Sequence, residues 1–238
     1  MPQSYLLFVM GSLGLLALVV VGALRTAQLL RHWRPDRNLL LLPAENLLRG
    51  VLVLCAIGLG LLSGLPPERL GWRSLDLVGD ILWGVGIGGF LAVVIYLGTQ
   101  WAVRRWGDHL YDAFIVRNIT PRSASEWPLL LGALLLAVTT EELLFRSLLL
   151  GGLSPPLPFW PLAFVLAICF GVVHLPQGRL AVAVTTLAGL LFAWLFLTRR
   201  SLWASLVAHY VANGLQLWIS YRQQQETSIA MGEDGPCK

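Results

Sequence analysis

The chain has 238 residues, of which 56% are hydrophobic and 13% are charged, and its formal net charge is +4. A soluble domain usually carries about 25% charged residues, so the composition excludes an ordinary soluble fold. The basic residues form no polar stripe interleaved with aromatic side chains, so the sequence does not indicate a nucleic-acid partner. We therefore expect an all-α protein, a polytopic bundle of transmembrane helices embedded in a lipid bilayer.

Long apolar runs follow one another along the chain, and a run of about 18 or more residues is typical of a transmembrane helix. The first run has no positive charge before it and is longer than a signal-peptide core, so we expect an uncleaved span. Residues 101–114 mix basic, aromatic and acidic side chains, which predicts a helix lying at the membrane interface. About seven spans are expected, at residues 5–24, 47–63, 80–99, 128–150, 159–175, 180–197 and 202–220.

The basic residues predict how the bundle is oriented. If the connections alternate between the two sides, twelve basic residues fall on one side and four on the other. The side richer in Arg and Lys is the cytoplasmic one, so we expect the N-terminus outside and the C-terminus in the cytoplasm of a bacterial-type plasma membrane. The simplest partition is one membrane domain at 1–222 and a polar tail at 223–238, which we expect to be disordered.

Polar residues inside the apolar runs are the main functional signal, because a charge at the centre of a membrane helix costs about 2.5–3.5 kcal/mol. The fourth run carries Glu141, Glu142 and Arg146. Glu142 and Arg146 are four residues apart with the acid first, the favourable order for an ion pair on one helix face. Glu141 points about 100° away from Glu142, so we expect it to find a partner on another helix or on a metal.

The fifth and seventh runs supply the other polar side chains. The fifth has one strongly polar residue, His174, with Phe170 one turn before it. In the seventh, four polar residues share one stripe of the helix because their spacing is four, four and three. They are Ser205, His209, Asn213 and Gln216. Taken alone, each set is also explained by packing or by hydrogen bonds between helices.

The expected depths allow these groups to meet. With a rise of about 1.5 Å per residue and a hydrocarbon core about 30 Å thick, Glu141 and His209 lie roughly 10 Å from the outer face. On the same estimate Asn213 lies about 17 Å and His174 about 22 Å from that face. A carboxylate, two imidazoles and an amide in one dry cavity can activate water and stabilise an oxyanion, which is the chemistry of amide hydrolysis.

Three short motifs carry a family resemblance. The segments Glu141-Glu142-Leu-Leu-Phe-Arg146, Phe170-Gly-Val-Val-His174 and His209-Tyr-Val-Ala-Asn213 have the patterns EExxxR, FxxxH and HxxxN. In this order, each in its own apolar run, they resemble the CAAX protease and bacteriocin-processing (CPBP, Abi) family of intramembrane metalloproteases, which includes the Ras-converting CAAX prenyl endopeptidases. The motifs lie within residues 127–218.

The resemblance implies a role for each motif residue. Glu141 and His174 would activate the attacking water, while His209 and Asn213 would hold either a divalent metal or the oxyanion. Zinc is the metal it implies, with Glu141, His174 and His209 as the ligands, and Glu142, Arg146 and Phe170 would support the site. The substrate would be a peptide or a protein tail, which in the CAAX endopeptidases is lipid-modified and cut near its C-terminus.

Two other classes of protein would keep these residues. A non-catalytic bacteriocin-immunity or scaffold protein would use the same bundle to bind a partner. An ion-coupled transporter would also carry intramembrane Glu and His, but it typically shows paired halves with broken helices, and we find no such pairing in the sequence.

Other polar and glycine-rich segments are interpreted as structural. Residues 84–89 fit the pattern GxGxxG, but no strand precedes them, so Gly84 and Gly88 predict a helix-packing face instead of a dinucleotide site. Asp108, His109 and Asp112 are expected on the polar face of the interfacial helix.

Overall fold

A computed structural model describes residues 3–30, 32, 37–107, 113–154 and 157–230. Its described residues form a helical bundle without a strand, which confirms the all-α class. The long helices are α1 (Gln3–Leu29), α2 (Pro43–Leu62), α3 (Leu77–Trp106), α5 (Trp127–Glu142), α6 (Phe159–Val173), α7 (Arg179–Arg199) and α8 (Leu202–Ala230). The short helices are η1 (Leu39–Leu41), α4 (Ala113–Ile119), η3 (Ala124–Glu126) and η5 (Leu175–Gln177), and a π-helix, η4 (Leu143–Gly151), continues α5.

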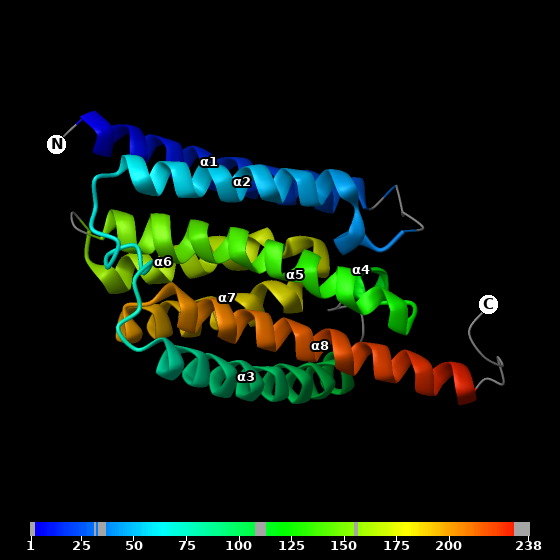
Figure 1. Cartoon of the computed structure of the whole chain (residues 1–238). Coiled ribbons are helices and arrows are strands. Elements are labelled where there is room, and N and C mark those ends of the chain that lie inside the picture. Colours follow the sequence, from blue (N-terminus) through cyan, green and yellow to red (C-terminus); the bar gives the residue numbers. More distant parts are fainter. Residues whose placement is uncertain (1–2, 31, 33–36, 108–112, 155–156, 231–238) are drawn as a thin grey trace.

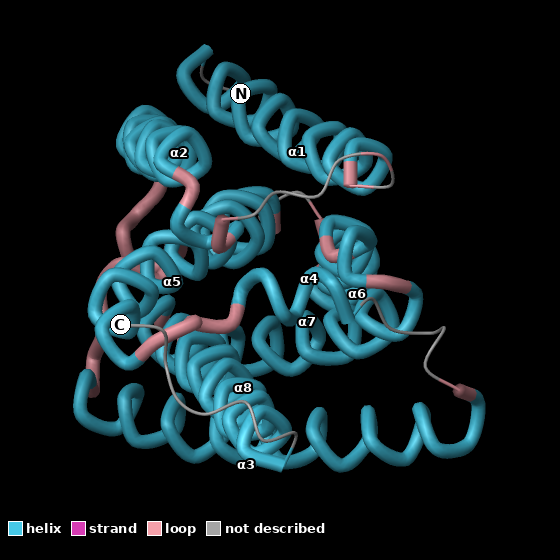
Figure 2. Tube along the Cα trace, turned by 90° about the vertical axis from the view of Figure 1, so that its right-hand side faces the viewer, coloured by secondary structure: helices cyan, strands magenta, loops and turns pink. Residues whose placement is uncertain are grey.

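The helices are stacked in layers. Figures 1 and 2 show α1 and α2 paired on one side, α5, η4 and α6 beneath them, then α7 and α8, with α3 on the far side. α3 packs along α8, and α6 packs along α7. The centre of the bundle is η4, where every residue from Leu143 to Gly151 is buried. A π-helix is rare and often lies at a functional site, and this one starts directly after Glu142.

Five segments are long and apolar enough to cross a membrane: Gln3–Leu29, Pro43–Leu62, Leu77–Trp106, Ala124–Gly151 and Arg179–Arg199. These match five of the seven expected spans and support an integral membrane protein. α6 has 15 residues, which rise only about 22 Å. α8 is long but is not among the five, because its polar stripe and its polar last turns lower its hydropathy.

Two expected boundaries differ from the structure. The expected start of an interfacial helix at residue 101 is wrong, because residues 101–106 belong to α3, which ends at Trp106 with Gly107 as its C-cap at a φ of 92° that suits glycine. Asp108, His109 and Asp112 lie outside the described residues. At the other end α8 runs on to Ala230, so residues 223–230, which we expected to be part of a disordered tail, are helical, and residues 231–238 lie outside the description.

The glycine packing face on α3 is confirmed. A methyl group on Gly88 would lie 2.5 Å from the carbonyl oxygen of Ala208, and one on Gly84 would lie 2.7 Å from Cβ of Val207. The two helix backbones therefore approach closely at these glycines, which fixes α8 next to α3. Ala208 directly precedes His209, so this contact also fixes the height and rotation of that histidine.

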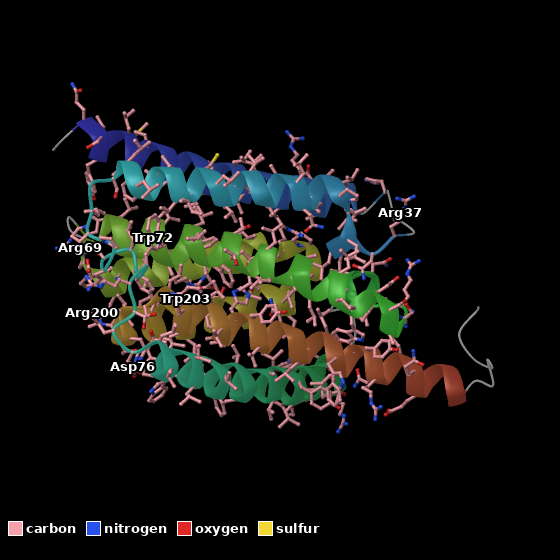
Figure 3. The ribbon with its side chains drawn as sticks, in the orientation of Figure 1. Arg37, Arg69, Trp72, Asp76, Arg200 and Trp203 are labelled. Atoms are coloured by element: carbon pink, nitrogen blue, oxygen red, sulfur yellow. The ribbon has the colours of Figure 1, made fainter. Side chains whose placement is uncertain are left out.

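A cluster of charges ties α3 to α7 at one end of the bundle. Nε of Arg199 donates to Oδ1 of Asp80 at 2.7 Å, and its Nη2 donates to Oδ2 of Asp76 at 2.9 Å. Asp76 also caps α3 by accepting a hydrogen bond from the backbone N–H of Gly79. Figure 3 shows Asp76 at the same end as Arg69, Trp72 and Arg200, and Arg37 at the opposite end.

We expect Gly88→Ala to destabilise the protein by about 1–3 kcal/mol, because the backbone of Ala208 has no room to yield. Gly86→Ala is the matched control on the same helix, since a methyl group there meets nothing within 4 Å. The control should be unchanged or slightly more stable, because alanine favours a helix. Thermal unfolding in detergent checks both, and equal stability of the two variants would contradict the close approach of α3 and α8.

The cluster around Arg199 predicts a pH dependence. Hydrogen bonds from the Gly79 N–H and from Arg199 lower the pKa of Asp76 below its usual value. Its stabilisation is therefore present above the unfolded pKa of about 3.9 and is lost as the pH falls through the lower folded pKa. We expect Asp76→Ala to lower Tm at pH 7, and the difference from wild type to shrink as the pH falls below about 4. A difference that does not depend on pH would show that the Asp76 charge is not involved.

Candidate functional site

The centre of the site is a buried ion pair inside one helical segment. Nη1 of Arg146 lies 3.2 Å from Oε1 of Glu142, and the two side chains are 3% and 0% exposed. Nη2 of Arg146 donates to the carbonyl oxygen of Gly189 at 3.2 Å. The guanidinium also lies over the Phe170 ring, 4.6 Å from its centroid, and 5.4 Å from that of Phe192. A carboxylate, a carbonyl and two aromatic faces therefore replace the water that the guanidinium gives up on burial.

His209 is held on several sides. Its Nδ1 lies 2.9 Å from Oε1 of Glu142, and because an ionised carboxylate only accepts hydrogen bonds, Nδ1 carries the proton. The imidazole stacks on Phe192 with centroids 4.8 Å apart and an interplanar angle of 23°. It meets Phe170 edge to face at 5.7 Å. The ring is 3% exposed, so both its plane and its rotation are set by the surrounding protein.

Glu141 faces the other edge of the same imidazole. Its Oε2 lies 3.7 Å from Nε2 of His209, and its side chain is 25% exposed, in contrast to the fully buried Glu142. A separation of 3.7 Å is too long for a hydrogen bond. Glu141 and Nε2 of His209 therefore lie close together without satisfying each other, which is an arrangement that can receive a third polar group.

His174 lies directly after the last residue of α6, so it is at the end of a helix. Its Nδ1 lies 2.8 Å from the carbonyl oxygen of Phe170. A carbonyl only accepts, so this ring also carries its proton on Nδ1 and leaves Nε2 without one in the neutral form. His174 contacts the Phe170 ring at a centroid distance of 4.8 Å, so both imidazoles touch the same phenyl ring.

Asn213 is half-buried on α8, one turn beyond His209. Its side chain makes no hydrogen bond within the described part of the chain. The expected polar stripe of α8 is divided: Ser205 and His209 lie beside Glu142, while Gln216 donates to the carbonyl oxygen of Ala92 on α3. The contacts therefore join Glu141, Glu142, Arg146 and His209 directly, and His174 through Phe170. Asn213 is placed near them only by its position on α8.

The described residues contain no group of three His, Cys, Asp or Glu side chains that could hold a metal ion. Glu141, His174 and His209, the ligands that the resemblance implies, do not form such a group. The proton on Nδ1 of both histidines leaves only the Nε2 atoms as donors to a metal, and Nε2 of His209 lies beside Glu141. Among the described residues these three side chains therefore do not form a preassembled set of metal ligands.

Two site residues on α7 were not expected from the sequence. Phe192 stacks on His209, and Gly189 supplies the carbonyl that binds Arg146. Residues 180–197 contain no charged side chain, and the hydroxyl groups of Thr185 and Thr186 bond to carbonyls of their own helix, so no polar side chain there indicated the site. A phenylalanine and a glycine in an apolar span are indistinguishable from ordinary packing residues until the helices are placed together.

The comparison with protein families connects this geometry to known proteins. Residues 123–215 match the family described as type II CAAX prenyl endopeptidase Rce1-like. The match covers less than half of the chain and includes all three motifs, so it confirms the resemblance inferred from them. The comparison with curated proteins gave no match, and neither did the comparison with solved structures.

The buried ion pair predicts a large effect on stability. Arg146→Met leaves the carboxylate of Glu142 buried beside a methionine, which should cost roughly 3–5 kcal/mol. The double variant Glu142→Gln with Arg146→Met removes both charges and should recover a large part of that loss. Denaturant unfolding in detergent measures both variants, and a double variant no more stable than Arg146→Met would contradict the pairing.

Proposed function

We propose that this protein, whose residues 123–215 match the CAAX prenyl endopeptidases, is an intramembrane endopeptidase that hydrolyses a peptide bond with activated water. The observation that supports this most directly is the bracketing of one buried imidazole by two adjacent glutamates. Nδ1 of His209 bonds Glu142, and its Nε2 faces Glu141 across 3.7 Å. A partly exposed carboxylate close to an oriented imidazole edge supports the proposal, because such a pair can serve as a base and a stabilising group in peptide hydrolysis.

In this proposal Glu141 is the general base. Its carboxylate would accept a proton from a water molecule, and the water oxygen would attack the carbonyl carbon of the scissile peptide bond. Nε2 of His174 would orient that water as a second acceptor. When the tetrahedral intermediate collapses, the C–N bond breaks and the proton held on Glu141 passes to the leaving amine. The carboxylate is thereby restored for the next cycle.

His209 and Asn213 would stabilise the oxyanion. Nε2 of His209 faces Glu141, and an imidazole with a proton on each nitrogen would donate from Nε2 as well as from Nδ1. The amide of Asn213 makes no hydrogen bond in the described part of the chain, so its N–H groups are available. Hydrogen-bond donors that meet the developing negative charge in a site shielded from water are usually the largest single contribution to the rate of acyl transfer.

The family match supports a peptide or protein substrate and a lipid environment. We propose further that the substrate is lipid-modified and is cut near its C-terminus. We also propose that the protein lies in a bacterial-type plasma membrane with its C-terminus in the cytoplasm, because twelve of the basic residues fall on that side by alternation. Dependence on a divalent metal, with zinc as the ion implied by the resemblance, stays a prediction.

Cleavage of a tagged peptide library in detergent, with prenylated and unmodified members, tests the proposal. We expect Glu141→Gln to lower kcat by about 100-fold or more, because the general base is lost. Gly132→Ala is a matched control on the same helix, since a methyl group there meets nothing within 4 Å. A chelator arm tests the metal prediction in the same assay.

Two results would overturn the proposal. The first is full cleavage by Glu141→Gln, which would remove the carboxylate from the mechanism. The second is the absence of cleavage by the wild-type protein together with full complementation in cells by Glu141→Ala, which would favour a binding protein. Loss of activity with chelator would add a metal to the mechanism without removing Glu141.

A further inference from the structure

We propose that Glu142 is a positioning residue that orients His209 for the reaction, with Arg146 holding Glu142 in place. The inference rests on the proposed function, because it assigns a role to the second glutamate of the same site. The spacing of Glu142 and Arg146 suggests only a pair that neutralises itself. The structure adds a second contact to the same carboxylate oxygen, since Oε1 of Glu142 meets both Nη1 of Arg146 and Nδ1 of His209.

The aromatic walls fix the plane of the imidazole but not which edge faces the reaction. Phe192 stacks on the ring, and Phe170 meets it edge to face. Stacking is almost unchanged if the imidazole turns by 180° about its bond to Cβ, which exchanges Nδ1 with a carbon. The hydrogen bond from Nδ1 to Glu142 distinguishes the two orientations. Without this hydrogen bond the ring has two orientations of similar energy. In one of them Cε1 takes the place of Nε2 next to Glu141.

The carboxylate that selects this orientation is itself held. Glu142 is 0% exposed and its Oε2 has no hydrogen-bond partner among the described residues, so Oε1 carries its contacts. Arg146 is kept in place by the carbonyl of Gly189 and by the ring of Phe170. The result is a chain of contacts from Arg146 through Glu142 and His209 to Glu141, with the partly exposed carboxylate at one end and the buried cation at the other.

Helix geometry explains why two consecutive glutamates are needed. Neighbouring residues on a helix point about 100° apart, so one helix can present a carboxylate to each edge of an imidazole lying beside it. Glu142 lies at hydrogen-bonding distance from the imidazole, 2.9 Å, while Glu141 lies 3.7 Å away and its side chain is partly exposed. The adjacent acids therefore have different roles: Glu142 binds and orients the imidazole, and Glu141 is free to meet substrate.

The test compares Glu142→Leu and Glu142→Gln in the full-length protein in detergent. Glu142→Leu removes the acceptor, and we expect kcat to fall on the order of 100-fold with KM little changed, because the ring is misplaced without loss of substrate contacts. Glu142→Gln keeps a carbonyl oxygen that can accept from Nδ1, so it should retain more activity than Glu142→Leu. Ser147→Ala is the control, since Ser147 is buried in the same segment but contacts Trp72 and should leave kcat unchanged.

A second measurement reports on the ring itself. In protein labelled with ¹⁵N-histidine, the His209 signals, assigned with His209→Gln, should show the proton on Nδ1 in wild type and in Glu142→Gln. In Glu142→Leu a fraction of the His209 rings should lack the proton on Nδ1. An unchanged Nδ1 proton in Glu142→Leu, or an unchanged kcat, would overturn the positioning role. Because this measurement needs no substrate, it decides the role of Glu142 even if the proposed peptidase activity is refuted by Glu141→Gln.

Discussion

The ion pair between Glu142 and Arg146 is the interaction on which the centre of this bundle depends. Both side chains are almost completely buried in a protein whose outer helices are apolar. A charge inside a membrane helix is costly on its own, so each must be satisfied by the protein. Arg146 donates a hydrogen bond to the carbonyl oxygen of Gly189 and lies over the ring of Phe170. Glu142 accepts a hydrogen bond from His209. The partners of the two buried charges therefore come from α6, α7 and α8, and their contacts hold these helices against the segment formed by α5 and η4.

The same constraint gives the site its asymmetry. One glutamate is used for structure, because it is fully buried and bound on one oxygen by a cation and an imidazole. Its neighbour in the chain, Glu141, is partly exposed and has no hydrogen-bond partner among the residues that the structure describes. The proposed role of Glu141 as general base depends on this difference, because a base must be within reach of the substrate water. The glycines of α3 contribute indirectly to the position of His209. The close contact of Gly88 with Ala208 fixes α8 at the residue that precedes this histidine.

Particular residues show how far the sequence could predict the fold and the site. The pairing of Glu142 with Arg146, the contact of Phe170 with His174 and the packing role of Gly84 and Gly88 follow from spacing along one helix, and each is present in the structure. Spacing could not reveal that His209 would bond Glu142, because that contact depends on how α8 is rotated relative to α5. The expected end of the third span was also wrong. The mixed polarity of residues 101–106 suggests a new element, but the backbone of α3 continues as a helix to Trp106.

By itself the sequence determined the class of protein and the inventory of its chemistry. Apolar runs of membrane length allow only helices whose backbone groups are satisfied internally, and three motifs place acids, imidazoles and an amide on separate helices. The tertiary structure decided which of these groups meet and which atoms they use. It brought Glu142 to Nδ1 of His209 and placed Phe192, an apolar residue of α7, against the same ring. The physical reason is that contacts within a helix follow from its fixed periodicity, whereas contacts between helices depend on rotation, depth and crossing, which packing alone sets.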